Sequence, residues 1–283
     1  MTFTDNGNTL WALLQAAANQ EGGLNKQTER YSRFVKYDVT DPLNPVYLSQ
    51  YVVPLPLFVN PTAKASKNPQ VAAQSEIHAL PNGQFFVLSR DSNNGHGASG
   101  TNSTYRHIDV FDISQATDIK DLGLDCATCA VANPTTGVLN STITPALYCS
   151  FLDFNVNAQL NRFRLHNGGA QDSFLLVRFS SFLLLLLSSI SLPHTPSPET
   201  NGVGLCDEKL KKGKQNEKWE SIAMVPIDPT GGNPTNEYYV FSLSDNDFIT
   251  QNGFMNWGKF PYSDASGYNV DNQALVFLVQ LPS

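Results

Sequence analysis

Short apolar runs separated by turn signals recur along the chain. Asn6-Gly7 and Asn82-Gly83 are each followed by a mostly apolar run, at positions 9–14 and 85–88. An Asn-Gly pair readily adopts the positive φ angles of a tight hairpin turn, and a strand is expected to follow it. The pattern therefore predicts turn-plus-strand units.

These units repeat at a nearly constant interval. The two Asn-Gly turns are 76 residues apart, and the strands that contain Tyr37-Asp38 and Phe111-Asp112 are 74 residues apart. A third copy is predicted at 238–245 and 274–279. Repeats of several short strands are typical of a β-propeller. We therefore predict an all-β fold of β-propeller-like repeats, with a β-sandwich as the alternative.

The repeats are also predicted to be incomplete. Glu76 and Glu220 each open a Glu-x-x-Ala-apolar stretch in the second and third copies, and the equivalent position of the first copy would precede Met1. Three partial repeats do not close a propeller, which typically has about four to eight blades. The pattern thus predicts an N-terminally truncated chain, or fragment.

Composition favours a secreted β protein. Charged residues make up 15% of the chain, against roughly 25% in a typical soluble domain. Together with 19 Gly and 17 Pro, this excludes coiled coils and long helical bundles. The net charge of −7 argues against nucleic acid as a partner, because binding a phosphate backbone needs a clustered basic surface.

The four cysteines favour disulfides over zinc. Cys126 and Cys129 form a C-x-x-C pair, but Cys149 and Cys206 are 57 residues apart. That second interval is not the spacing of a zinc ribbon. Disulfide bonds are therefore the expected state of these cysteines.

Two sequons, at Asn102 and Asn140, predict N-glycosylation and an extracellular protein. The first residues, 1–5, are polar and lack the apolar core of a signal peptide. We therefore expect the true N-terminus, with its secretion signal, to be missing from this chain.

One segment does not fit the repeats. Residues 174–203 are dominated by Phe, Ser, Leu and Pro, whose codons share pyrimidine-rich sequences. Arg178 and five serines make the run a poor membrane span, which needs about 20 apolar residues. We interpret it as a retained intron, so the predicted organisation is repeats at 1–172, an anomalous insertion at 173–204, and continued repeats at 205–283.

Acidic residues recur at comparable places in the repeats. The inner strands of a propeller end at its central channel, so acids at successive strand ends are expected to converge there. Convergent carboxylates suit Ca²⁺, which takes about six to eight oxygen ligands. Such a cation would bind a phosphate ester and polarise its P–O bonds, with Arg90 as a further phosphate contact. The alternative for each Asp is a turn cap.

Other catalytic signatures are absent from the sequence. It contains no G-x-S-x-G nucleophile elbow and no Walker loop.

Three segments carry a family resemblance: 75–91 (SEIHALPNGQFFVLSRD), 218–223 (KWESIA) and 241–247 (FSLSDND). They resemble the phytase-like, or "esterase-like activity of phytase", family, and most closely its fungal secreted members. The likeness covers residues 1–172 and resumes near 217–283. It implies a propeller-like β domain with phosphoesterase or esterase activity. The acidic set carried over is Glu76, Asp91, Glu220, Asp245 and Asp247.

We therefore expect a secreted hydrolase that acts on phosphoric esters through a carboxylate-bound divalent cation. Glu76 and Glu220 are the expected Ca²⁺ ligands or general bases, with Asp91 as a supporting catalytic residue and Asp245 and Asp247 as further ligands. The expected partner is a small phosphate ester, with neither nucleic acid nor membrane, and the sequence leaves the oligomeric state open. Two alternatives remain: a non-catalytic propeller that binds a protein or glycan, and a carboxylic-ester or lactone hydrolase.

Overall fold

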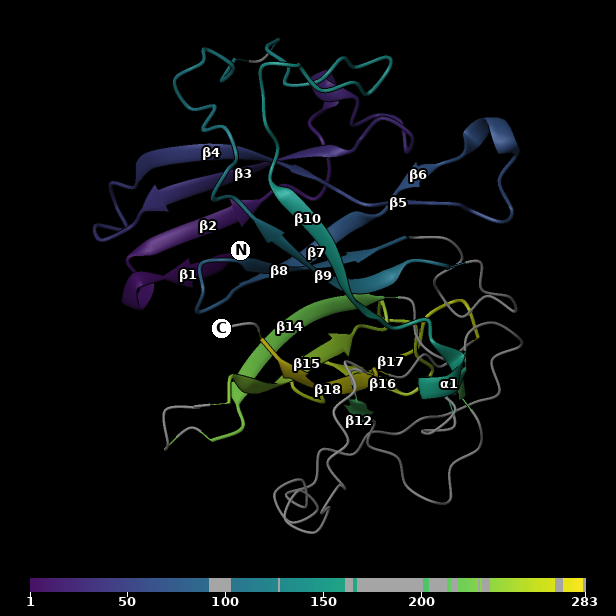
Figure 1. Ribbon diagram of the computed structural model, residues 1–283. Coiled ribbons are helices and arrows are strands. Elements are labelled where there is room, and N and C mark those ends of the chain that lie inside the picture. Colours follow the sequence, from purple (N-terminus) through teal and green to yellow (C-terminus); the bar gives the residue numbers. More distant parts are fainter. Residues whose placement is uncertain are drawn as a thin grey trace.

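A computed structural model places three four-stranded sheets along the chain. It describes residues 1–91, 103–126, 128–160, 165–166, 201–203, 213–214, 218–228, 230, 235–267 and 272–281. Within these residues the secondary structure is almost all strand, which confirms the all-β prediction (Figure 1). None of the described helices has the length and hydropathy to cross a membrane.

The first sheet is an antiparallel meander in the order β1-β2-β3-β4. Its turn between the first two strands uses Asn6, at φ 56°, and Gly7, at φ 90°, as the Asn-Gly signal predicts. Its strands are β1 (Thr2–Thr4), β2 (Thr9–Leu13), β3 (Tyr31–Asp38) and β4 (Val46–Pro54).

The second sheet repeats this order as β7-β8-β9-β10. Gly83, at φ 83°, makes the turn between its first two strands. Tyr37 in β3 and Phe111 in β9 both lie one residue before the end of a third strand, so the predicted repeat is confirmed. The strands are β7 (Ala73–Ala79), β8 (Phe85–Arg90), β9 (Arg106–Asp112) and β10 (Leu147–Asp153).

The third sheet has the order β14-β15-β18-β12. The two apolar segments predicted for the third copy form β15 (Glu237–Ser244) and β18 (Ala274–Gln280), as expected. The first strand is β14 (Trp219–Pro226), and the fourth is β12 (Asn201–Val203), which precedes the others in sequence. Residues 173–200 and 204 of the predicted insertion lie outside the described part of the chain, whereas residues 201–203 of it form β12 and pair with β18.

Shorter elements lie between and beside the sheets. β5 (Leu57–Phe58) pairs with β6 (Gln70–Val71), β11 (Leu165–His166) with β13 (Gly213–Lys214), and β16 (Gly253–Met255) with β17 (Phe260–Tyr262). Single helical turns are η1 (Asp5–Gly7), η2 (Asn19–Glu21), η3 (Ala65–Lys67) and α1 (Asn157–Leu160).

Aromatic residues fill the spaces between consecutive sheets. Trp11 and Phe34 of the first sheet stack on each other at 4.9 Å, and Phe34 meets Phe85 of the second sheet edge-on at 4.9 Å. On the opposite face of the second sheet, Phe86 belongs to a separate apolar cluster with Trp219 of the third sheet. Burying each such side chain contributes about 2–3 kcal/mol, so the second sheet is held on both faces.

The first strands of the three sheets are neighbours. β1 lies beside β7, and β7 lies beside β14. The N-terminal amine of Met1 contacts the carboxylate of Glu76 at 3.2 Å, and the Ser75 hydroxyl donates to the Trp219 carbonyl at 2.9 Å. The strands that start the repeats therefore lie side by side.

Candidate functional site

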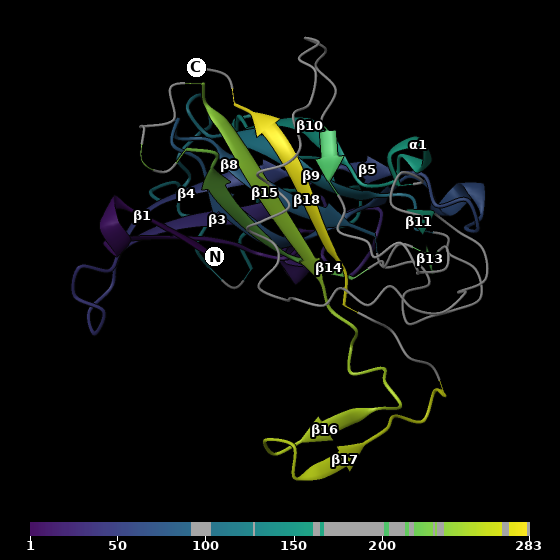
Figure 2. The same ribbon diagram turned by 90° about the horizontal axis from the view of Figure 1, so that it is seen from below.

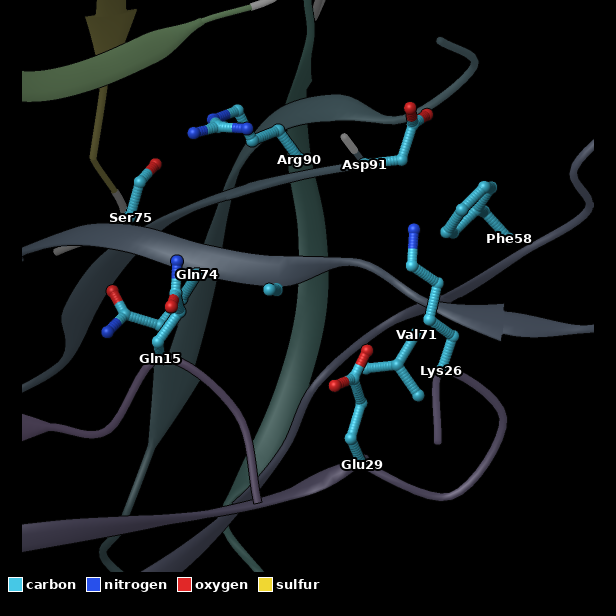
Figure 3. A pocket seen from close by; sticks show the side chains of 10 residues that line it. Gln15, Lys26, Glu29, Phe58, Val71, Gln74, Ser75, Arg90 and Asp91 are labelled. Atoms are coloured by element: carbon cyan, nitrogen blue, oxygen red, sulfur yellow. The ribbon is translucent and has the colours of Figure 1, made fainter. Parts of the chain in front are cut away.

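A small pocket lies where the first and second sheets meet, at the start of β7 (Figure 3). Its volume is about 80 Å³, well below the roughly 300–1,000 Å³ of sites that hold whole organic ligands. The pocket therefore suits a single small polar group. Its lining residues are Gln15, Lys26, Glu29, Phe58, Val71, Ala73, Gln74, Ser75, Arg90 and Asp91.

Lys26 and Glu29 place opposite charges in this pocket, from the loop before β3. Figure 3 shows the Lys26 side chain extending towards Asp91, with Glu29 on its other side. Burial raises the pKa of the Glu29 carboxyl, and the nearby charge of Lys26 opposes part of this rise. A carboxyl group with a raised pKa keeps its proton to higher pH, so Glu29 is suited to proton transfer.

Asp91, predicted as a catalytic residue, borders the pocket and fixes the backbone that follows it. It is 2% exposed. Its Oδ2 accepts hydrogen bonds from the backbone N–H groups of Thr104 at 2.6 Å and Tyr105 at 2.8 Å. Asp91 therefore joins the ends of the segment that connects β8 to β9.

Arg90, predicted as the phosphate contact, also borders the pocket, and its guanidinium forms an ion pair with Glu220. The Arg90 Nε is buried and has no hydrogen-bond partner among the described residues. An unpaired buried donor costs roughly 1–3 kcal/mol, so this N–H requires water or a ligand.

Gln74 presents a hydrogen-bond acceptor, the complement of the Arg90 donor, on the other face of β7. Its Nε2 donates to the Leu13 carbonyl at 2.8 Å, which fixes the orientation of the amide. The buried Oε1 is left without a hydrogen-bond partner in the part of the chain that the structure describes. The pocket is therefore bordered by a free donor and a free acceptor, as expected for a site that holds polar molecules.

Glu76 does not line this pocket. Its Oε1 contacts the Met1 amine at 3.2 Å and accepts a hydrogen bond from the Ile77 N–H at 2.9 Å. The side chain is thus directed to β1 rather than towards Arg90 and Asp91.

The predicted equivalence of Glu76 and Glu220 is wrong by one position. In β7 the pairing with β8 shifts between Gln74 and Glu76, and in β14 the pairing with β15 shifts between Trp219 and Ser221. Glu220 therefore corresponds to Ser75, the extra residue of the bulge in β7. A bulge reverses which face the next side chains occupy, and this change is invisible in the sequence pattern.

Asp245 and Asp247 lie in the turn after β15. The Asp247 N–H donates to Asp245 Oδ1 at 2.7 Å, and Asp247 Oδ2 lies 3.2 Å from the Lys218 ammonium. Asp247 has a φ of 49°, which Asp tolerates in turns. Asp245 thus caps the turn, and Asp247 forms an ion pair with Lys218.

The predicted Ca²⁺ ligands are not brought together. No group of three or more His, Cys, Asp or Glu side chains suited to a metal ion occurs within the described ranges. Glu76 contacts the N-terminus, Glu220 contacts Arg90, and Asp247 contacts Lys218. As placed here, these carboxylates do not fit one cation site, and the Ca²⁺ site stays a prediction.

Lys26, Glu29 and Gln74 were missed by the sequence analysis. No motif or repeat position marks them, because they meet only through contacts between the first and second sheets. The one available signal is that Gln74 directly precedes the recognisable segment 75–91.

The predicted disulfide and one predicted glycosylation site can be located. Cys126 and Cys129 are joined by a disulfide, and Cys149 is an exposed free thiol. Asn140 is exposed, and its Oδ1 accepts hydrogen bonds from the backbone and hydroxyl of Thr142. Asn102 and Cys206 lie outside the described residues.

These observations define an all-β protein of repeated four-stranded sheets with a polar pocket between the first two. The family model named phytase-like, with the description "Esterase-like activity of phytase", matches residues 1–145. The chain belongs to this family.

A relative named "Uncharacterized secreted protein", from Arthroderma benhamiae, is 42% identical over 258 residues. The matched region covers 89% of this chain and 42% of that relative, so the chain spans less than half of the relative's length. No solved structure matches the chain.

Proposed function

We propose that the protein is a secreted hydrolase that cleaves phosphoric esters at the pocket between the first and second sheets. The observation that carries this proposal is the placement of Lys26 and Glu29 together in the lining of a hollow bordered by Arg90 and Asp91, with the pKa of the Glu29 carboxyl raised by burial. Membership of the phytase-like family supports a hydrolase-like activity, and the relative named as a secreted protein supports an extracellular location.

The lining residues supply the two requirements of ester cleavage. The Lys26 ammonium offsets the charge of a phosphoryl oxygen. Water attacks phosphorus, the P–O bond to the alcohol breaks, and protonated Glu29 donates its proton to the departing oxygen. The proton released by the attacking water restores Glu29, so the products are the alcohol and inorganic phosphate.

Arg90 and Asp91 act at the border of this reaction. The Arg90 Nε offers a further donor to phosphate, while Glu220 holds the other end of the guanidinium. Asp91 positions the start of the β9 segment through its two backbone hydrogen bonds. In this proposal, Glu220 and Asp91 are positioning residues.

Calcium is kept as a second proposal. A Ca²⁺ ion held by Glu76, Glu220, Asp245 and Asp247 would require the Glu220–Arg90 and Asp247–Lys218 ion pairs to open. The bound ion would supply charge neutralisation for phosphate. The pocket chemistry above does not depend on it.

We also propose that the three sheets are successive blades of a propeller. The same strand order in the first two sheets, the face-to-face apolar packing and the neighbouring positions of β1, β7 and β14 support this arrangement. The pocket then lies between two blades, next to their innermost strands.

Hydrolysis of chromogenic substrates tests the proposal. The purified protein is incubated with a phosphate monoester, a phosphate diester and a short acyl ester, and the Glu29→Gln and Lys26→Gln variants are compared with Glu76→Gln. Phosphate-ester turnover that is lost in the first two variants and retained in Glu76→Gln supports the pocket mechanism.

Other outcomes identify the alternatives. Turnover lost in Glu76→Gln but retained in Glu29→Gln would assign the catalytic role to the carboxylates predicted from the sequence. Cleavage of the acyl ester alone would identify a carboxylic-ester hydrolase. A folded protein without turnover on any substrate would favour the binding module.

A further inference from the structure

A hairpin of β16 and β17 projects from the third sheet. It is inserted between β15 and β18, and Figure 2 shows it extending away from the three sheets. A two-stranded hairpin is only marginally stable by itself in water. A partner that covers it would therefore add much of its stability.

Both faces of this hairpin are apolar. Phe254 lies opposite Pro261 on one face, and Met255 lies opposite Phe260 on the other. Phe254 is 69% exposed, Phe260 56% and Met255 52%. A hairpin that lay flat on a protein surface would keep one face polar, so these two faces indicate insertion into a medium that surrounds them.

The tip of the hairpin carries a tryptophan. Asn256, Trp257 and Gly258 have φ angles of 48°, 58° and 83°, which form the tight turn between the strands. Trp257 is 98% exposed. Fully exposed Trp is rare in soluble proteins, whereas Trp side chains are enriched at the lipid–water interface.

The hairpin and its flanking residues differ in charge from the chain as a whole. Residues 248–263 contain no Asp or Glu and one basic residue, Lys259, in a chain with a net charge of −7. A tip without acidic residues avoids the free-energy cost of bringing carboxylates into the headgroup region. The aliphatic part of the Lys259 side chain can extend from apolar surroundings so that its ammonium reaches water.

We propose that the protein docks on a lipid surface by inserting the β16–β17 hairpin, with Trp257 at the headgroup level and Phe254, Met255 and Phe260 in the acyl boundary. The sequence analysis expects no membrane partner because it considers only apolar runs long enough to span a bilayer. Interfacial insertion needs a few apolar side chains at one projecting point. This proposal is independent of the hydrolase activity.

Tryptophan fluorescence provides a direct test. The chain has three tryptophans, and Trp11 and Trp219 are 7% and 0% exposed. Trp257 is therefore the tryptophan whose emission responds to added vesicles. Emission is recorded while phosphatidylcholine vesicles are added, and bound protein is measured in parallel by co-sedimentation.

The expected result is a blue shift of emission together with co-sedimentation. The Trp257→Phe variant keeps binding and loses the shift, which assigns the signal. The Phe254→Ser variant weakens partitioning by about tenfold, because one buried aromatic contributes at least 1.4 kcal/mol. The matched control is Leu43→Ser, which replaces an apolar residue that is 88% exposed in the β3–β4 turn, and it leaves binding unchanged.

Two results would overturn the proposal. One is the absence of both shift and co-sedimentation in the folded protein. The other is a blue shift that follows protein concentration without vesicles, because it would identify a second copy of the chain as the occupant. Either result leaves the ester-hydrolysis assay unaffected, so the two proposals fail separately.

Discussion

Arg90 on β8 and Glu220 on β14 form an ion pair that joins the second sheet to the third. The Arg90 side chain is 10% exposed and that of Glu220 is 32% exposed. The ion pair is therefore neither a fully buried nor a fully exposed one. Both residues are predicted from the sequence as site residues, and in the structure they are each other's partner in an ion pair.

Replacing Glu220 by Gln is expected to lower the free energy of unfolding by about 2 kcal/mol, since a mostly buried guanidinium loses its counter-charge. Urea denaturation measures this loss. The control is Glu237→Gln, a charge removal on the adjacent strand, which is expected to cost less than about 0.5 kcal/mol. Equal losses in the two variants would mean that the ion pair has no specific role.

Asp91 is expected to be a structural requirement for the pocket. The Asp91→Ala variant leaves the N–H groups of Thr104 and Tyr105 without their acceptor, at a cost of about 3 kcal/mol. Asp91→Asn keeps one carbonyl oxygen as acceptor and should cost clearly less. Denaturant unfolding of both variants measures this order, and a reversed order would contradict the assigned contacts.

Glu29 is expected to make stability depend on pH. Burial raises its pKa above the ordinary value of 4.5, so the folded state binds its proton more tightly than the unfolded state. The stabilisation is fully present below the ordinary pKa and is lost as pH rises through the raised pKa.

The matching experiment is urea unfolding of the wild-type protein and of the Glu29→Gln variant at pH values from below the ordinary pKa of Glu29 to above its raised pKa. The wild type should lose stability relative to the variant as pH increases, and the acidic form of Glu29 should coincide with the active one in a pH–rate profile. Parallel stability curves for the two proteins would show that the Glu29 carboxyl titrates normally.

Removal of divalent cations distinguishes the pocket mechanism from the calcium proposal. Because Lys26 and Arg90 supply positive charge without a metal, turnover is expected to persist after EDTA treatment and dialysis. The measurement is phosphate release before and after EDTA, then with added Ca²⁺. Loss of turnover that Ca²⁺ restores and Mg²⁺ does not would establish the calcium site instead.

Asn140 is expected to carry a glycan when the protein is made in a eukaryotic secretory host, since the residue is exposed and precedes Ser141-Thr142. Mass spectrometry of tryptic peptides with and without glycosidase treatment measures its occupancy. Asn133 is the internal control, because it is also exposed but Pro134 blocks its sequon. An unmodified Asn140 would contradict the expectation.

The sequence was sufficient to predict the β class and several of the strands. Asn-Gly turns have local φ preferences, and the apolar runs after them form β2 and β8 as expected. Similar apolar patterns at 238–245 and 274–279 located β15 and β18 as well. These features depend on neighbours within a few residues, so the sequence pattern carries them directly.

The site depended on contacts that the sequence does not encode locally. The family resemblance directed attention to segment 75–91, and Arg90 and Asp91 do border the pocket. Both β7 and β14 contain a bulge, but Glu220 occupies the bulge position of β14 whereas Glu76 follows the bulge of β7. A shift of one residue moves a side chain to the opposite face of a strand, so repeated acidic residues did not become convergent ones.

The sequence by itself determined the β class, the recurrence of turn-plus-strand units, the Asn-Gly turns and the family. Only the tertiary structure decided which polar groups meet. Lys26 and Glu29 reach the edge of β7 from a separate loop, and Arg33 finds the fully buried carboxylate of Glu21 at 2.5 Å. The physical reason is that turns and strand alternation follow from local backbone preferences, whereas these contacts depend on how separate segments pack around shared apolar faces.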